Sequence, residues 1–206
     1  MTRLFIVRHG ETEWNALGLL QGAVDIPLSD AGREQAARAA SALAQLVSPD
    51  AVLVASPLSR AHDTGLALGA ALGAPVAVDA RLRERAYGVW EGITPEEREE
   101  RWPVEVAEWH AHGNPGIEGF EVHDLVRERM VAAVDEWVAR APGDVVMFSH
   151  GSSARIGIMG LLGLPLDHRT LGNLGNTRWS VLSRGESGSW TLLRHNIGVE
   201  SLRGAS

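Results

Sequence analysis

Three short apolar segments, each followed directly by polar residues, constrain the fold more than any other feature of this sequence. They are residues 4–7, 52–55 and 145–148, and a weaker segment of the same kind lies at 76–78. Each is continuous and rich in β-branched side chains, a pattern typical of strands buried on both faces. These segments therefore predict the strands of a mostly parallel sheet.

Helical patterns separate the predicted strands. We expect helices over residues 30–47, 58–72, 122–140 and 152–162, and a further helix that begins at Thr94 and Pro95. Near the end of the chain, residues 179–182 and 190–193 flank a glycine-containing turn and predict a hairpin. Alternating strands and helices predict an α/β fold, a three-layer αβα sandwich. No repeat or linker divides the chain, so we expect a single domain.

Composition and charge narrow the functional classes. The chain has 206 residues, 45% of them apolar, and no apolar run approaches the ~20 residues that cross a bilayer. The N-terminal apolar run is too short for a signal peptide, so we expect a cytoplasmic protein without a membrane partner. The net charge of −7 argues against nucleic acid as a partner.

Two residue types are missing from the sequence. There is no cysteine, which excludes thiol nucleophiles, disulfides and thiolate zinc sites. All 19 basic residues are arginine, so a P-loop or a Schiff base to pyridoxal phosphate would lack its lysine. An anionic substrate would have to be bound by a local group of arginines.

Such a group is predicted where three strands end. The segment 4–7 leads into Arg8 and His9, the segment 52–55 into the loop that contains Arg60, and the segment 145–148 into His150. In open α/β sheets, ligands bind beyond the carboxyl ends of the strands. If the strands are parallel neighbours, two histidines and two arginines meet at one edge of the sheet.

This set of residues suits phosphoryl transfer. Neutral His9 can attack phosphorus, while Arg8 and Arg60 offer paired donors to the phosphoryl oxygens. We expect His150 to be cationic and to donate to the same group. A glycine follows each histidine, Gly10 and Gly151, which would let the backbone approach the ligand closely.

The leaving oxygen needs a proton, and two carboxylic acids are candidates for supplying it. Glu84 is the first choice because it follows the predicted strand at 76–78. Glu11 is the alternative, although it is placed better to interact with the backbone or with arginines around the first loop.

At these residues the sequence resembles the histidine phosphatase superfamily, also called the phosphoglycerate mutase-like family. The matching segments are Arg8-His9-Gly10-Glu11-Thr12-Glu13-Trp14-Asn15, Leu20-Gln21-Gly22, Ser56-Pro57-Leu58-Ser59-Arg60-Ala61, Leu82-Arg83-Glu84, Ser149-His150-Gly151 and Gly175-Asn176-Thr177. They occur in the expected order over nearly the whole chain.

The resemblance implies a role for each matching position. His9 would accept the phosphoryl group, Arg8, Arg60 and His150 would hold it, and Glu84 would donate the proton, without a metal or another cofactor. Asn15, Gln21, Gly22 and Asn176 would bind the substrate together with Gly10 and Gly151. A small helical cap, inserted at about residues 93–125, would cover the active site.

The implied substrate is a small phosphorylated metabolite. No insert of the kind that cofactor-dependent mutases carry follows Glu84, which favours a small bacterial phosphatase over a phosphoglycerate mutase. Residues 171–179 resemble phosphatases of glucosyl-3-phosphoglycerate. A binding module without activity is the third hypothesis, and the intact set of catalytic residues argues against it. The oligomeric state is open, with a homodimer the commonest case.

Two regions do not fit a known pattern. Many members of the superfamily carry Gly-Gly-Glu-Ser before the fourth helix, whereas this chain has Gly116-Ile117-Glu118-Gly119-Phe120-Glu121, with no serine and with Phe120 inside. Substrate contacts in that region cannot be transferred. His110, His112 and His123 could together suggest a metal site, but without supporting cysteines or carboxylates we expect them to be exposed.

Overall fold

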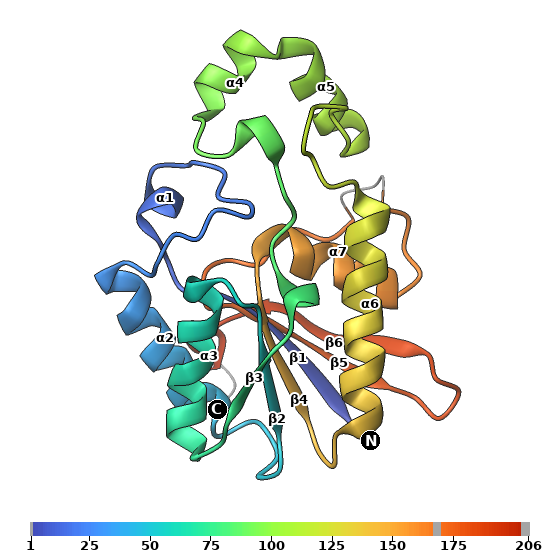
Figure 1. Ribbon diagram of the computed structural model, residues 1–206. Helices are drawn as coiled ribbons and strands as arrows, with labels where there is room; N and C mark the ends of the chain where they lie inside the picture. Colours follow the sequence, from blue (N-terminus) through green and yellow to red (C-terminus); the bar gives the residue numbers. More distant parts are fainter. Residues whose placement is uncertain (1, 167–169, 203–206) are drawn as a thin grey trace.

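The computed structural model describes residues 2–166 and 170–202. Within these residues one six-stranded sheet has the order β3-β2-β4-β1-β5-β6 (Figure 1). The strands are β1 (Arg3–Arg8), β2 (Val52–Ala55), β3 (Val76–Val78), β4 (Val145–Ser149), β5 (Trp179–Arg184) and β6 (Trp190–Ile197). Strands β1 to β4 run parallel, and β5 and β6 form an antiparallel hairpin beside β1. The predicted mostly parallel sheet and the hairpin are confirmed.

Helices cover both faces of the sheet. Figure 1 shows α2 (Asp30–Leu43) and α3 (Ser59–Leu72) on one side, and α6 (His123–Arg140) and α7 (Gly151–Leu161) on the other. Successive side chains of a strand point to opposite faces. Leu4 and Ile6 of β1 accordingly pack in one apolar cluster and Phe5 and Val7 in the other. Burial on both faces explains the continuous apolar strands and confirms the three-layer sandwich.

The predicted helices occur, with small differences at their ends. The hydroxyl of Ser29 accepts a hydrogen bond from the Gly32 N–H at 3.0 Å and so caps α2. This helix ends at Leu43, not at residue 47, because residues 44–46 form a turn. The four-residue helices α1 (Glu13–Ala16) and α8 (Val199–Leu202) are too short to show a helical period and were not predicted.

The segment from residue 93 to residue 122, here called the cap segment, lies beyond the carboxyl ends of the strands (Figure 1). It contains α4 (Pro95–Arg101), which Thr94 caps as expected, and α5 (Pro103–His112), which was not predicted. Edge-to-face aromatic contacts join Trp109 and Phe120 to Tyr87 and Trp90, which precede the segment. Among the described residues, no helix combines the length and the apolar character needed to cross a membrane.

Candidate active site

The parallel register of the sheet brings the predicted residues to one edge. Arg8 of β1 lies opposite Ser149 of β4, so His9 and His150 follow neighbouring strands at the same level. Their ring centroids are 5.1 Å apart. A pocket of about 160 Å³ opens here and is lined by Arg8, His9, Arg60 and Glu84, among others. Because these are the residues predicted to be catalytic, we call it the catalytic pocket. The convergence that the sequence predicted is therefore present in the structure.

The orientation of His9 leaves one ring nitrogen available to a ligand. Nδ1 lies 2.6 Å from the carbonyl oxygen of Gly10, which can only accept, so Nδ1 carries the proton. The lone pair is then on Nε2. Burial, followed by the charges of Arg8 and Arg60, lowers the pKa of His9 well below its usual value. The imidazole is neutral at physiological pH, as a nucleophile requires.

The two arginines are fixed by backbone carbonyl groups. Arg60 is fully buried at the start of α3 and donates from Nη1 to Val24 O and from Nη2 to Gly22 O, at 2.8 and 2.9 Å. Arg8 donates from Nη1 to Leu174 O at 2.7 Å. The Nε atoms of both arginines are buried and have no hydrogen-bond partner within the described part of the chain. An oxyanion in the pocket would satisfy donors of this kind.

His150 differs from expectation in its charge. Its Nε2 lies 2.8 Å from the hydroxyl of Ser56, and its buried Nδ1 has no partner among the described residues. Burial, together with the positive charges of Arg60 and Arg8, lowers the pKa of His150 well below its usual value. The lowered pKa favours the neutral form of His150 in the protein alone, whereas the cationic form was expected beside a phosphoryl group. A bound dianion would favour the charged form again, because it would offset the two arginines.

Glu84 is the only carboxylate among the described residues that line the catalytic pocket. Its Oε1 accepts from the N–H groups of Arg85 and Ser153, both at 2.9 Å, and its Oε2 accepts from Ser152 N at 3.1 Å. Two of these donors belong to the first turn of α7. The alternative acid, Glu11, lies outside the pocket, with its carboxylate 3.5 Å from the hydroxyl of Ser29.

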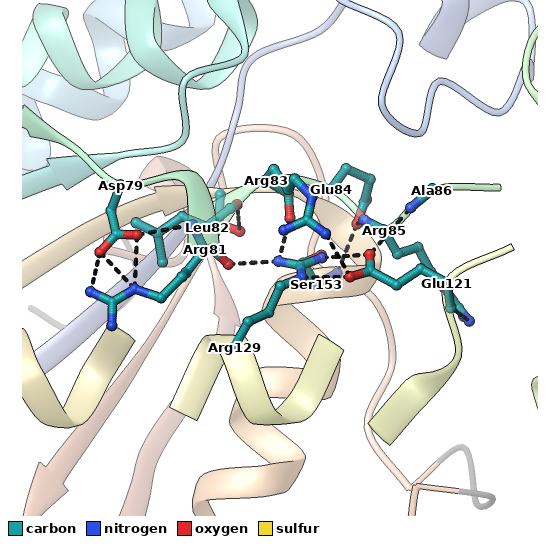
Figure 2. Close-up of polar contacts among 11 residues, drawn as sticks. Asp79, Arg81, Leu82, Arg83, Glu84, Arg85, Ala86, Glu121, Arg129 and Ser153 are labelled. Atoms are coloured by element: carbon teal, nitrogen blue, oxygen red, sulfur yellow. Dashed lines mark hydrogen bonds and ion pairs between the residues drawn. The ribbon is translucent and has the colours of Figure 1, made fainter. Parts of the chain in front are cut away.

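An ion-pair network behind Glu84 was not predicted. Figure 2 shows Arg129 of α6 between the loop that carries Glu84 and the cap segment. Arg129 pairs with Glu121 through Nε and Nη2, and it donates from Nη1 to the carbonyl groups of Arg81 and Arg83, at 2.6 and 2.8 Å. A further bond reaches Ser153 at 3.1 Å. Such a network has no sequence signal, because its members are separated by irregular distances of 8 to 48 positions.

Four of the six predicted substrate-binding residues line the pocket. They are Asn15, Gln21, Gly22 and Gly151. The Oε1 atom of Gln21 is buried and has no partner among the described residues. Gly22 adopts a positive φ of 52°, and a Cβ atom there would lie 2.0 Å from the carboxylate of Glu91. The contact with Glu91 explains why glycine stands at this position.

The other two predicted residues lie behind the pocket lining. Gly10 does not line the pocket; a Cβ atom there would lie 2.5 Å from Gly32 O, so this glycine allows close packing against α2. Asn176 also lies outside the lining. Its Nδ2 donates to His9 O and to Asn15 Oδ1, both at 3.1 Å. Asn176 thus holds the backbone of His9 in place.

Tyr87, Ser152 and Asn173 line the pocket and were not predicted as site residues. Each reaches the pocket from a different part of the chain. Tyr87 could have been found from the sequence, because it lies three residues after Glu84 on the same loop. Burial raises the pKa of Tyr87 to about 12, so its hydroxyl stays protonated and remains a donor.

The described residues contain no group of three or more histidine or acidic side chains placed to hold a metal ion. His110 and His112 are exposed, as expected, and His112 pairs with Glu108 at 2.9 Å. The same expectation is wrong for His123, which is partly buried at the start of α6 and lines a second cavity.

Comparisons with known proteins agree with this geometry. The glucosyl-3-phosphoglycerate phosphatase of Mycolicibacterium vanbaalenii is 38% identical, over 96% of this chain and 93% of the relative. A probable phosphoglycerate mutase of Yersinia enterocolitica is 36% identical, over 80% of this chain and 77% of the relative. The solved structure of a mycobacterial glucosyl-3-phosphoglycerate phosphatase in complex with VO3 superimposes with a TM-score of 0.88 at 34% identity, over 96% of this chain and 100% of that one.

Residues 4–198 match the histidine phosphatase superfamily, branch 1. This range includes both histidines, both arginines and the carboxylate of the catalytic pocket. The chain therefore belongs to the histidine phosphatase superfamily, as a phosphatase of its first branch.

Proposed function

We propose that the chain hydrolyses phosphate monoesters of small metabolites through a phosphohistidine intermediate on His9. One observation carries this proposal. Beside the neutral imidazole of His9, three buried nitrogen atoms lack partners among the described residues: Arg8 Nε, Arg60 Nε and His150 Nδ1. A phosphoryl group would satisfy all three, and it is the reacting group on which a neutral imidazole acts as a nucleophile.

In the first step, Nε2 of His9 forms a bond to phosphorus while the bond from phosphorus to the leaving oxygen breaks. Arg8 and Arg60 offset the charge on the transferring phosphoryl oxygens. The leaving oxygen takes a proton from the protonated form of Glu84 and departs as the alcohol.

In the second step, water attacks the phosphohistidine. Glu84, now a carboxylate, accepts the proton of that water as the bond from phosphorus to Nε2 breaks. Inorganic phosphate leaves, and both His9 and Glu84 return to their starting forms. The residues of the pocket supply the nucleophile, the charge and the proton for both steps, so the proposed cycle uses no cofactor.

The substrate that we propose is glucosyl-3-phosphoglycerate. Two relatives named glucosyl-3-phosphoglycerate phosphatase support this choice; they are 38% and 36% identical over 96% and 88% of this chain. The alternative is a phosphoglycerate mutase, supported by the relative of that name at 36% identity. A mutase would return the phosphoryl group to a sugar acid, which requires water to be kept out of the pocket.

Product analysis separates these functions. The protein is incubated with glucosyl-3-phosphoglycerate and, separately, with 3-phosphoglycerate and bisphosphoglycerate, and phosphate and 2-phosphoglycerate are measured. We expect phosphate release and an acid-labile phosphoprotein, both absent from His9→Ala. Formation of 2-phosphoglycerate without phosphate would identify a mutase. Turnover no faster than that of His9→Ala on any monoester, p-nitrophenyl phosphate included, would leave a binding module.

A further inference from the structure

A second cavity adjoins the catalytic pocket. Its volume is about 310 Å³, and it shares Tyr87, Ser152 and Asn173 with the smaller pocket beside it. The two hollows are therefore neighbours at these residues. A substrate whose phosphate is held by Arg8 and Arg60 would extend its other end into this space, which we call the side cavity.

Arg85 lies in the wall of the side cavity and is held in one position. The residue is 1% exposed. Its Nε and Nη2 donate to the carbonyl oxygen of Glu121, at 3.1 and 2.5 Å, and its guanidinium lies 4.2 Å from the ring centroid of Phe120. Nη1 donates to no described residue, so the group retains donors for a ligand. A guanidinium fixed in this way loses little entropy when it binds an anion.

Phe120 makes this arrangement possible. It lies within the segment where this chain departs from the Gly-Gly-Glu-Ser pattern of many members of the superfamily. Its ring contacts both the guanidinium of Arg85 and the ring of Tyr87, whose centroid is 5.7 Å away. A glycine would offer Arg85 no aromatic face. The departure from the family pattern thus coincides with the fixed arginine of the side cavity.

Two further nitrogen-bearing side chains line the same cavity, Arg155 of α7 and His123 of α6. Nε2 of His123 is buried and lacks a hydrogen-bond partner within the described part of the chain. Burial, then the charges of Arg85 and Arg155, lower the pKa of His123 to about 4. The imidazole is thus neutral at physiological pH, and its environment is electrostatically positive.

Nearby carboxylates offset this positive environment only in part, since the charge of Asp124 acts on His123 less than the charges of Arg85 and Arg155 do. Glu84 is held by three backbone N–H groups, and Glu121 is paired with Arg83 and Arg129. Neither lines the side cavity, and no carboxylate occurs among its described lining residues. Burial is the main factor that lowers the pKa of Arg85, and the charge of Arg155 lowers it further. An anion between the two arginines would relieve both effects.

We infer that Arg85 and Arg155, beside the neutral ring of His123, form a second anion-binding site, which selects phosphate monoesters that carry another oxyanion on the leaving alcohol. A carboxylate or a second phosphate would supply the required charge. Its binding there would place the ester oxygen beside Glu84 and the phosphorus beside His9. This inference rests on the proposed function, because it describes the other half of the same substrate.

Ligand pairs that differ only in the second charge test the inference. Calorimetry in the His9→Ala protein, which cannot turn the ligand over, compares 3-phosphoglycerate with glycerol 1-phosphate, in which CH₂OH replaces the carboxylate. A second comparison uses glycerol 1,3-bisphosphate in place of 3-phosphoglycerate. We expect at least one of the two ligands with a second anionic group to bind at least about tenfold more tightly than glycerol 1-phosphate, which is the gain typical of a hydrogen bond to a charged group.

The same affinity ratio is then measured after Arg85→Met and after Arg155→Met, each combined with His9→Ala. Each change should reduce the ratio at least about fivefold, while Arg140→Met, which removes an exposed arginine paired with Glu136, should leave it unchanged. If Arg85→Met does not fold, Arg155→Met decides.

A ratio near one for both ligand pairs would overturn the inference, as would a ratio that neither substitution alters. A high ratio for 3-phosphoglycerate identifies the oxyanion as a carboxylate, and a high ratio for glycerol 1,3-bisphosphate identifies it as a phosphate. The proposed function is judged separately, by turnover of p-nitrophenyl phosphate in the protein with intact His9. A protein that hydrolyses monoesters without preferring a second anion would keep the function and lose the side-cavity site.

Discussion

The catalytic pocket and the side cavity are neighbours that use the same chemistry, buried arginine beside histidine, but they are built differently. His9 and His150 directly follow strands β1 and β4, and Arg60 lies in the first turn of the helix after β2. Arg85, by contrast, is held by the cap segment, through Glu121 O and the ring of Phe120. The sheet thus positions the reacting groups, and the cap segment positions the groups that would contact the rest of the substrate.

This difference has a consequence for variation. Strand ends in a parallel sheet are fixed by the backbone hydrogen bonds on both sides, so a change in a loop cannot shift them far. The wall of the side cavity depends on side-chain contacts such as the 4.2 Å contact between Arg85 and Phe120. One substitution in the cap segment can alter those contacts while the catalytic pocket stays intact. The predictions below test this separation.

Removal of Arg60 should give the largest effect, and the effect should not depend on the leaving alcohol. Arg60→Met removes a buried donor to the phosphoryl group, which we expect to lower kcat/KM on the order of 10³-fold for every monoester. Arg85→Met should instead change the ratio between anionic and neutral leaving alcohols. Steady-state kinetics on 3-phosphoglycerate and glycerol 1-phosphate, with melting temperatures as a folding control, measures both. A selective loss in Arg60→Met would contradict the separation.

Arg129 joins the two regions, so its loss should destabilise the protein. Arg129→Met leaves Glu121 without its bidentate partner, and breaking a nearly buried ion pair costs about 3–5 kcal/mol. Arg127→Met, in the same helix but in an exposed pair with Asp124, should cost less than about 1 kcal/mol. Urea unfolding measures both free energies. Equal losses in the two variants would show that the network adds nothing to the fold.

The contribution of this network should also depend on pH. Burial alone would raise the pKa of Glu121, but the hydrogen bonds from Arg129 and the charge of Arg83 outweigh it, so the pKa is lowered. A lowered pKa adds stability that is present above the unfolded value of about 4.3 and is lost as pH falls through the folded value. The difference in unfolding free energy between the original protein and Arg129→Met should therefore shrink below about pH 4.

The proton-donor role of Glu84 predicts an intermediate effect that depends on the leaving group. Glu84→Gln should reduce kcat about 10²-fold or more for alkyl esters, because an alkoxide needs a proton. The loss should be smaller for p-nitrophenyl phosphate, whose leaving group is stable as an anion. Comparing the two substrates in one preparation cancels any loss of folded protein. Identical losses would remove Glu84 from the acid role.

Replacing either of the two glycines that follow the histidines should change the stability of the protein only modestly, and by different amounts. In Gly10→Ala the new Cβ atom would lie 2.5 Å from the backbone oxygen of Gly32, which forces a shift and costs about 1–3 kcal/mol. In Gly151→Ala the nearest neighbour of the new Cβ atom would be Arg8 Nε at 3.6 Å, an ordinary contact. Thermal unfolding of the two variants is the comparison. A larger loss in Gly151→Ala would show that the packing against α2 is not what requires glycine at position 10.

This architecture explains which parts of the site the sequence could predict. The strands, the hairpin and the meeting of His9, Arg60 and His150 were predictable, because the apolar period and the parallel-sheet rule depend on local sequence. The charge of His150 was not, since it depends on burial and on two arginines brought from other elements, Arg60 of α3 and Arg8 of β1. Nor was the packing role of Gly10, which depends on where α2 crosses the loop.

By itself, the sequence determined the sandwich and the reacting edge, because continuous apolar strands must be buried on both faces and their polar ends then share one side. Only the tertiary structure decided which acid faces the pocket, how Arg129 and Glu121 support it, and that Arg85, Arg155 and His123 line one cavity. These residues are distant in the sequence. Their proximity results from how the cap segment packs beyond the sheet and how α6 and α7 pack on one of its faces, which no local pattern encodes.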